Sequence, residues 1–235
     1  MQTDTQPVTI SQAREEASSI FLAKVFNWMA VGLGLTGIVA YLTAASGLAQ
    51  RIINSPLFIV LAIGTLGLVF FLSARINKIQ AKTASGLFIA YSVLNGLFFS
   101  TIFLRYTGSS IAGTFMITAG MFGAMAIYGL VTKRDLSGWG SFLFMGLIGI
   151  IIASIVNIFL KSPGMYWVIS MIGVLVFTGL TAYDVQKIKR MGEEGIMAQG
   201  HEAIVKGSIM GALALYLDFI NLFLMLLRFF GGSRN

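Results

Sequence analysis

Cysteine is absent from this 235-residue sequence, and charged residues make up only 11% of it. The lack of cysteine excludes disulfide bonds and metal sites built on thiolates. The sole histidine, His201, lies in a charged stretch and has no second histidine with which to bind a metal, so we interpret it as a solvated surface residue. A water-soluble domain of this length would carry about a quarter charged residues. The sequence therefore does not fit the soluble class.

Apolar residues are abundant instead, at 57% of the chain, and the mean hydropathy is +0.86. Lys and Arg divide the sequence into uncharged windows at 25–50, 52–74, 83–104, 106–132, 136–160 and 162–183, followed by the segment 207–227. Each window reaches the ~20 residues that a helix needs to cross a bilayer. We predict an all-α integral membrane protein with a cytoplasmic tail over 1–20 and a seven-helix transmembrane domain over 21–235. The first apolar run is too late and too long for a cleavable signal peptide, so we expect a retained first helix over 25–45.

The net charge of +7 does not indicate nucleic-acid binding, because the basic residues stand at helix ends rather than in one stripe. Eleven Lys and Arg residues fall on the side of the N-terminal tail, and five fall on the other side. The positive-inside rule then predicts a cytoplasmic N-terminus and a C-terminus outside. Asp184, Arg75 and Lys133 are expected near the cytoplasmic face, where they would suit a gate.

The last apolar segment, GSIMGALALYLDFINLFLMLL over 207–227, carries a single charge, Asp218, near its middle. A carboxylate at that depth costs a few kcal/mol on insertion scales, so it normally has a partner or lines a watery cavity. Helical spacing places Gly207, Gly211, Asp218 and Asn221 on one side, and the G-x-x-x-G pair favours close helix contact there. The expected partner is Asp184, which ends the preceding apolar run.

Two carboxylates close together in a low-dielectric site cannot easily both ionise, so the pair is expected to share a proton and titrate as a unit. Deprotonation would leave two repelling charges that separate the helices or attract a cation. Ca²⁺ prefers oxygen ligands, and two aspartates supply at most four of the six to eight that it takes, so we expect a weak calcium site at Asp184 and Asp218. Thr181 and Asn221 are candidate supporting polar residues. The alternative is a purely structural role, in which the two aspartates form a buried hydrogen-bonded pair, or an ion pair with Arg75, that only fixes the packing of the helices.

One geometric difficulty is visible in the sequence. If the last helix enters the membrane at Lys206, Asp218 lies about 18 Å along its axis, whereas Asp184 is only about one turn from Lys187. The two meet only if one of the helices extends further than its charges indicate.

An intramembrane aspartyl protease is the sharpest rival interpretation. Tyr183-Asp184 matches the first half of the protease signature. The second half requires Gly-x-Gly-Asp, whereas this chain has Tyr216-Leu217 before Asp218, and the Pro-Ala-Leu element is also absent. We therefore expect no enzymatic activity. No nucleotide-binding motif is present, and no cofactor is expected.

Glycines and amides inside the apolar segments have structural interpretations. Small residues let helices approach closely, so packing is expected at Gly32, Gly34, Gly37, Gly64, Gly67, Gly120, Gly123, Gly146 and Gly149. Asn95 and Asn157 are expected to bond between helices or to line a polar path.

The two aspartate motifs, GLTAYDVQKIK and ALYLDFINLFLMLLRFFG, closely resemble the paired signatures of the Bax inhibitor family (transmembrane Bax inhibitor motif proteins). The central region TAGMFGAMAIYGLVTKRDLSGWGSFLFMGLIGIIIASIVNIF is similar to the bacterial branch, whose members lie in the inner membrane. The resemblance covers nearly the whole chain beyond the N-terminal tail.

The resemblance implies a seven-helix fold in which six helices surround the last. It implies a pH-sensitive calcium leak through the bilayer, governed by protons at a di-aspartyl pair that maps onto Asp184 and Asp218. An arginine at the cytoplasmic end of the second helix would latch onto the first aspartate, and Arg75 is the best match. Some bacterial members resemble modulators of a membrane-bound ATP-dependent protease, and residues 1–20 are candidates for that contact.

Overall fold

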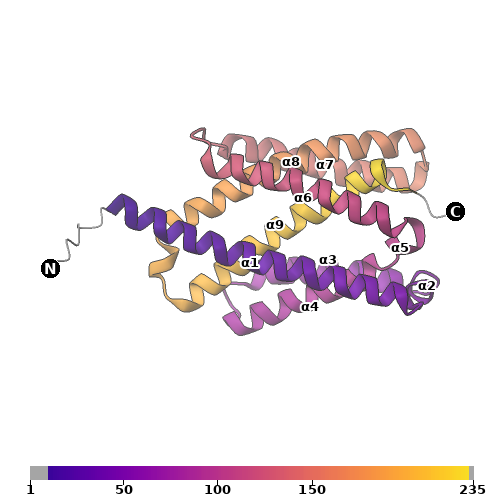
Figure 1. Cartoon of the computed structure of the whole chain (residues 1–235), viewed down its shortest axis with the longest axis horizontal. Coiled ribbons are helices and arrows are strands. Elements are labelled where there is room, and N and C mark those ends of the chain that lie inside the picture. Colours follow the sequence, from indigo (N-terminus) through magenta and orange to yellow (C-terminus); the bar gives the residue numbers. More distant parts are fainter. Residues whose placement is uncertain (1–9, 233–235) are drawn as a thin grey trace.

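The computed structural model of the chain describes residues 10–232, which fold into helices joined by short connections, without a β-strand in that range (Figure 1). The elements are α1 (Ile10–Ala45), α2 (Leu48–Ile53), α3 (Leu57–Arg75), α4 (Ala81–Phe99), α5 (Ile102–Arg105), α6 (Gly108–Val131), α7 (Ser137–Leu160), α8 (Pro163–Glu193), the 3₁₀ turn η1 (Ile196–Ala198) and α9 (His201–Phe230).

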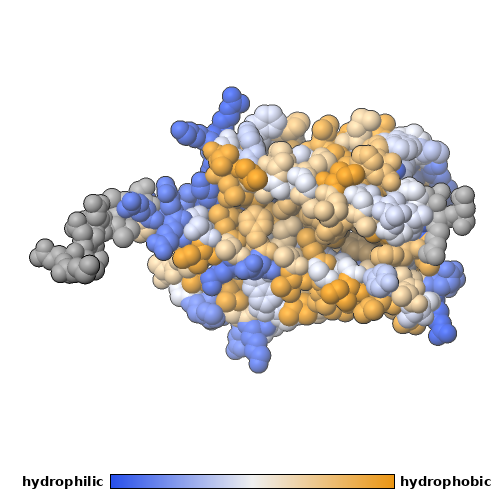
Figure 2. All heavy atoms as spheres, viewed as in Figure 1, coloured by the Kyte–Doolittle hydropathy of each residue, from blue (hydrophilic) through white to orange (hydrophobic). Residues whose placement is uncertain are grey.

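Seven helices in the described part are long and apolar enough to cross a membrane, with α4 and α5 forming one span. The predicted all-α fold with seven spans is therefore confirmed. Hydrophilic side chains gather towards the two ends of the bundle, and the band between them is largely apolar (Figure 2). We call the end where α1 begins the N-terminal end of the bundle, and the end where α9 finishes the C-terminal end.

The last helix, α9, crosses the middle of the bundle diagonally (Figure 1). Its most apolar stretch is 67% buried, whereas the same measure lies between 11% and 44% in the other six spans. Helices α1, α4, α6 and α8 pack directly against α9, while α3 packs mainly on α4 and α7 on α8. The central position expected for the last helix is confirmed, but four of the six other helices pack closely against it, whereas α3 and α7 pack mainly on those four.

Both helices that carry the aspartates extend beyond their apolar segments. The charged stretch 185–206, which separates the last two apolar segments of the sequence, is mostly helix, and only Glu194–Gly200 joins α8 to α9. Gly195 and Gly200 take positive φ values of 93° and 90° there, a conformation that glycine adopts without steric cost. The charged residues mark where each helix leaves the hydrocarbon core of the membrane, but the helix itself continues beyond them.

The N-terminal region differs from the sequence prediction in the same way. Helix α1 already begins at Ile10, well before the expected start at residue 25. Ser18 is buried, and its Oγ donates a hydrogen bond to the Lys189 carbonyl at 2.9 Å. Residues 10–24 are therefore a helical extension that packs on α8, whereas residues 1–9 of the predicted tail lie outside the described range.

The packing role predicted for nine glycines is wrong for seven of them. Only Gly32 and Gly146 lie against another helix, through Phe88 and Val176 respectively. The other seven face open space, because the presence of glycine in a segment does not say on which side of the helix it lies. Close approach occurs at glycines such as Gly129, where an added Cβ would meet the Ala182 carbonyl of α8.

Candidate functional site

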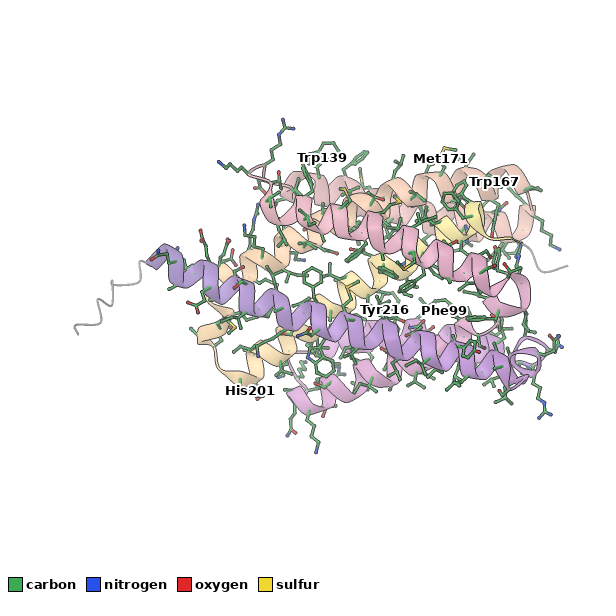
Figure 3. All side chains as sticks on the ribbon, in the orientation of Figure 1. Phe99, Trp139, Trp167, Met171, His201 and Tyr216 are labelled. Carbon is green, nitrogen blue, oxygen red and sulfur yellow. The ribbon has the colours of Figure 1, made fainter. Side chains whose placement is uncertain are left out.

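The rotation of α9 about its axis is fixed by Tyr216, which is fully buried in the bundle interior (Figure 3). Its hydroxyl lies 2.8 Å from Thr36 Oγ1 on α1, and Thr36 in turn donates to the Ser92 carbonyl on α4 at 2.9 Å. Since Thr36 uses its proton for Ser92, Tyr216 is the donor to Thr36. Three helices are thus joined by one chain of hydrogen bonds, which determines where Asp218, half a turn further on, must point.

Close contact between α8 and α9 depends on the predicted glycine pair. An added Cβ at Gly207 would collide with Ile196, and one at Gly211 would lie 3.1 Å from Val25 and 3.3 Å from Ile188. The prediction that Gly207 and Gly211 mediate helix contact is confirmed. Their lack of side chains lets the N-terminal half of α9 lie close to both α1 and α8.

Asp184 of α8 and Asp218 of α9 meet within the bundle, and their carboxyl groups lie within hydrogen-bonding reach of each other. Asp218 is only 4% exposed, and its Oδ2 finds no N–H or O–H donor within residues 10–232. A hydrogen bond between two carboxyl groups requires one of them to carry a proton. The meeting resolves the geometric difficulty, because α9 begins at His201 and runs diagonally through the bundle.

Both aspartates line a cavity of about 490 Å³ between α7, α8 and α9. Its polar lining also includes Ser141, Lys187 and Asn221. Asn221 donates its Nδ2 hydrogen to the Leu217 carbonyl at 2.8 Å, and its Oδ1 accepts no hydrogen bond from residues 10–232. The cavity thus offers two carboxyl groups, one amide oxygen and the Ser141 hydroxyl.

Lys187 is the cation whose charge acts on Asp184, although the two form no ion pair. It follows Asp184 by three residues on α8, so helical spacing places both on one side. Its Nζ lies 6.0 Å from the centre of the Tyr183 ring. In the sequence, Lys187 was noted only for its distance from Asp184, although a spacing of three residues on a helix already indicates that the two side chains share a face.

An apolar cluster borders the cavity. Phe177 and Leu180 of α8 line the cavity and also belong to a buried cluster with Leu222 and Leu226 of α9. Along α9 these two leucines follow Asp218 towards the C-terminal end of the bundle. The polar cavity therefore lies on the N-terminal side of a packed apolar layer.

Other predicted site residues lie away from the cavity. Thr181 is fully buried, donates to the Phe177 carbonyl at 2.8 Å and does not line the cavity. Arg75 is exposed at the end of α3 and forms no ion pair within the described residues. The predicted contact between Arg75 and Asp184 is thus absent from this arrangement of the helices.

The remaining polar candidates have local roles. His201 is exposed at the start of α9 (Figure 3). Asn95 donates to the Tyr91 carbonyl one turn earlier in its own helix, and Asn157 accepts from the Ser162 backbone at the end of α7. Neither amide lines the cavity.

A clamp that the sequence did not predict holds the α6–α7 connection against α8. Gln186 accepts a hydrogen bond from the Leu136 backbone at 2.9 Å and donates one to the Arg134 carbonyl at 2.8 Å. Arg190 forms an ion pair with Asp135. Hydrogen bonding from the Ser137 backbone and from Arg190 lowers the pKa of Asp135 to about 2. The clamp fixes α8 within one or two turns of Asp184.

Within residues 10–232, no group of three or more His, Cys, Asp and Glu side chains is arranged to hold a metal ion. The two carboxyl groups, the Asn221 oxygen and the Ser141 hydroxyl supply at most six oxygens, the lower limit of the six to eight that calcium takes, and only if both carboxyl groups bind through both of their oxygens. The donor set therefore fits only a weak, partly hydrated cation.

Comparison with known proteins gives the chain its relatives. The family described as "Inhibitor of apoptosis-promoting Bax1" matches residues 18–235. "Inner membrane protein YbhL" of Escherichia coli strain K12 is 54% identical over 216 residues, which cover 91% of this chain and 92% of that protein. An uncharacterized protein of Borreliella burgdorferi is 46% identical over 232 residues, covering 97% and 99% of the two chains. An uncharacterized protein of Deinococcus radiodurans is 43% identical over 232 residues, covering 98% and 96%.

The match to the family spans all seven transmembrane helices and both aspartate motifs. The chain belongs to the Bax inhibitor family of membrane proteins.

Proposed function

We propose that this protein is a pH-sensitive cation leak in a bacterial inner membrane, passing Ca²⁺ down its gradient under the control of Asp184 and Asp218. The observation that carries the proposal is the unpartnered Oδ2 of Asp218, buried beside a second carboxyl group in a polar cavity. The location follows from the seven spans and from the name of the Escherichia coli relative. The balance of basic residues favours a cytoplasmic N-terminal end.

The proposed switch is a shared proton. When one aspartate is protonated, it donates a hydrogen bond to the other and holds α8 against α9. Loss of the proton leaves two negative charges side by side, which repel each other and attract a cation. Separation of the two helices would also open the apolar layer formed by Phe177, Leu222 and Leu226, since that layer is built from the same pair of helices.

Calcium suits the pair because it is a hard cation that binds carboxylate and amide oxygens. The small number of protein oxygens at the cavity favours passage over storage, since a weakly held ion keeps part of its water and leaves readily. Asn221 is proposed as the supporting ligand because it lines the same cavity.

The test is calcium flux in proteoliposomes across pH 6 to 8, with wild type and Asp218→Asn compared. We expect wild-type flux to change with pH and the variant to lose that dependence while retaining its thermal stability. His201→Gln is the matched control, because it removes the sole histidine of the sequence, which is exposed and does not line the cavity. If Asp218→Asn leaks like wild type over this range, the pair is structural and the proposal fails.

A further inference from the structure

The two ends of the bundle differ in the sign of their charges. Within residues 10–232, the C-terminal end carries four basic residues, Arg51, Arg105, Lys161 and Arg228, and no acidic residue. The acidic residues of this described range that lie outside the membrane interior are all at the N-terminal end, from Glu15 on α1 to Glu202 on α9. The positive charge at the C-terminal end therefore has no counterion within the described part of the chain.

Two of these four basic residues line one cavity. Arg105 from α5 and Arg228 from α9 border a space of about 670 Å³, together with Tyr106 and Tyr166. Arg51 and Lys161 do not line it. A cavity that gathers two guanidinium groups without a carboxylate is a site for an anion.

Arg228 is held in a fixed orientation. Its guanidinium carbon lies 4.3 Å from the centre of the Tyr166 ring, and its Nη1 donates to Ser170 Oγ at 3.1 Å. A guanidinium carries five N–H donors, so most of them stay available to an incoming group. Arg105 lies over the Tyr106 ring at 5.7 Å and makes no hydrogen bond within residues 10–232, so it is free to pair with the same anion.

The two tyrosines add a neutral polar group between the arginines. The side chains of Tyr106 and Tyr166 lie within hydrogen-bonding reach of each other, and the charges of Arg105 and Arg228 both act on Tyr106. Burial raises the pKa of Tyr106, so its phenol stays protonated. It introduces no negative charge that would compete with an anion.

The rest of the lining is largely apolar, and it includes Phe58, Phe98 and Leu224. Phe58 and Phe98 stack with ring centres 5.0 Å apart. Close to this cavity, Trp167 packs against Phe229 at 4.9 Å, and such aromatic residues favour the membrane–water interface. The cavity thus combines two arginines with apolar walls at the depth of the membrane–water interface. This combination matches a molecule with an anionic head group and a hydrocarbon chain.

We propose that this cavity binds an anionic phospholipid of the leaflet at the C-terminal end, with its phosphate between Arg105 and Arg228 and an acyl chain along Phe58, Phe98 and Leu224. This site is separate from the di-aspartate cavity and does not depend on the activity proposed for it. A free phosphate ion would meet the same two arginines, so the experiment must separate the two sources.

The test uses the purified full chain in neutral detergent, titrated with phosphatidylglycerol or with phosphatidylcholine and followed by native mass spectrometry. Wild type is expected to retain phosphatidylglycerol in preference to phosphatidylcholine. The double variant Arg105→Gln/Arg228→Gln is expected to lose about fivefold in phosphatidylglycerol affinity for each arginine removed. Inorganic phosphate is tested in parallel by thermal shift.

The matched control is Arg51→Gln/Lys161→Gln, which removes the same charge from the same end without touching the cavity. Equal loss in both double variants would mean that affinity follows net charge, and it would overturn the site. Stabilisation by inorganic phosphate without a preference for phosphatidylglycerol would overturn the lipid assignment. If the double variant does not fold, Arg105→Gln alone serves as the test, because Arg105 is exposed and makes no hydrogen bond within residues 10–232. An unchanged lipid preference in Arg105→Gln would also contradict the proposal.

Discussion

Asp135 and Arg190 form an ion pair at the N-terminal end of the bundle, with 2.5 Å between the carboxylate Oδ1 and Nη2. The pair ties the α6–α7 connection to α8 six residues beyond Asp184. The predicted Arg75–Asp184 pair would have anchored the helix that carries the first aspartate to the end of α3. The Asp135–Arg190 pair anchors the same helix to the α6–α7 connection instead. The helix is thus held by a contact that does not involve Asp184, whose carboxyl group lies near that of Asp218.

Substitution Asp135→Asn is expected to leave the pH profile of calcium flux unchanged between pH 5 and 8. The pKa of Asp135 is lowered from its ordinary value of 3.8 to about 2. A carboxyl group with a lowered pKa contributes stability that is complete above its ordinary value and is lost as pH falls through the lowered one. The clamp is therefore intact over the whole range of the assay. A shifted profile in this variant would assign the pH response to the clamp instead of the aspartate pair.

Substitution Lys187→Ala is expected to raise calcium flux about twofold to fivefold at fixed pH, on the scale of one partly screened charge interaction. The ammonium group lies near Asp184 and competes with an incoming cation for its charge. Flux into proteoliposomes measures the effect. Lys133→Ala is the control, since Lys133 is exposed at the same end and does not line the cavity. Equal increases in both variants would show only a general surface-charge effect.

Substitution Gly140→Ala is expected to displace the Tyr183 ring and to change flux through the cavity. A Cβ at residue 140 would lie 2.5 Å from two atoms of that ring, and forcing atoms into a packed site typically costs about 1–3 kcal/mol. Thermal unfolding and flux are the two measurements. Gly149→Ala, in the same helix but facing open space, should change neither. If Gly140→Ala changed neither thermal unfolding nor flux, the Tyr183 ring would have room to move without affecting stability or the cavity.

Deletion of residues 2–9 is expected to leave calcium flux unchanged. It separates the leak from the alternative of a protease modulator that acts through its tail, because contact with a membrane-bound protease would be lost in the same variant. The deletion stops before α1, which begins at Ile10 and packs on α8 through Ser18. A longer deletion would disturb the bundle and confuse the two readouts. Loss of flux in the short deletion would tie the leak to the tail.

The sequence predicted the number of helices and the aspartate pair because both depend on strong physical constraints. A charge within an apolar segment of 21 residues needs a partner, and Asp184 at the end of the preceding apolar run was the expected one. The lengths of α8 and α9 could not be predicted. Outside the membrane, a stretch with charged residues such as Lys189 and Glu193 can form a helix as readily as an irregular connection. The Asp135–Arg190 clamp joins residues 55 positions apart, and no local pattern announces such a contact.

Glycines show the same limit. Gly207 and Gly211 were predicted correctly because their spacing from Asp218 placed them on the face that had to meet another helix. Gly34 and Gly64 had no such reference residue, and both face outward. A polar residue of known orientation therefore carries more information about a membrane helix than its small residues do.

The enclosed position of α9 has a consequence for biosynthesis. This helix leaves the ribosome after the other six spans, yet four of these earlier helices pack directly around it. The first six spans must therefore either leave a space at their centre in the bilayer or separate again when α9 inserts. On its own in lipid, α9 would expose Asp218 at a cost of about 2.5–3.5 kcal/mol on insertion scales, so docking against α8 relieves that cost and drives closure of the whole assembly. Chains that stop short of residue 201 would lack the centre of the bundle and would be ready substrates for membrane quality control.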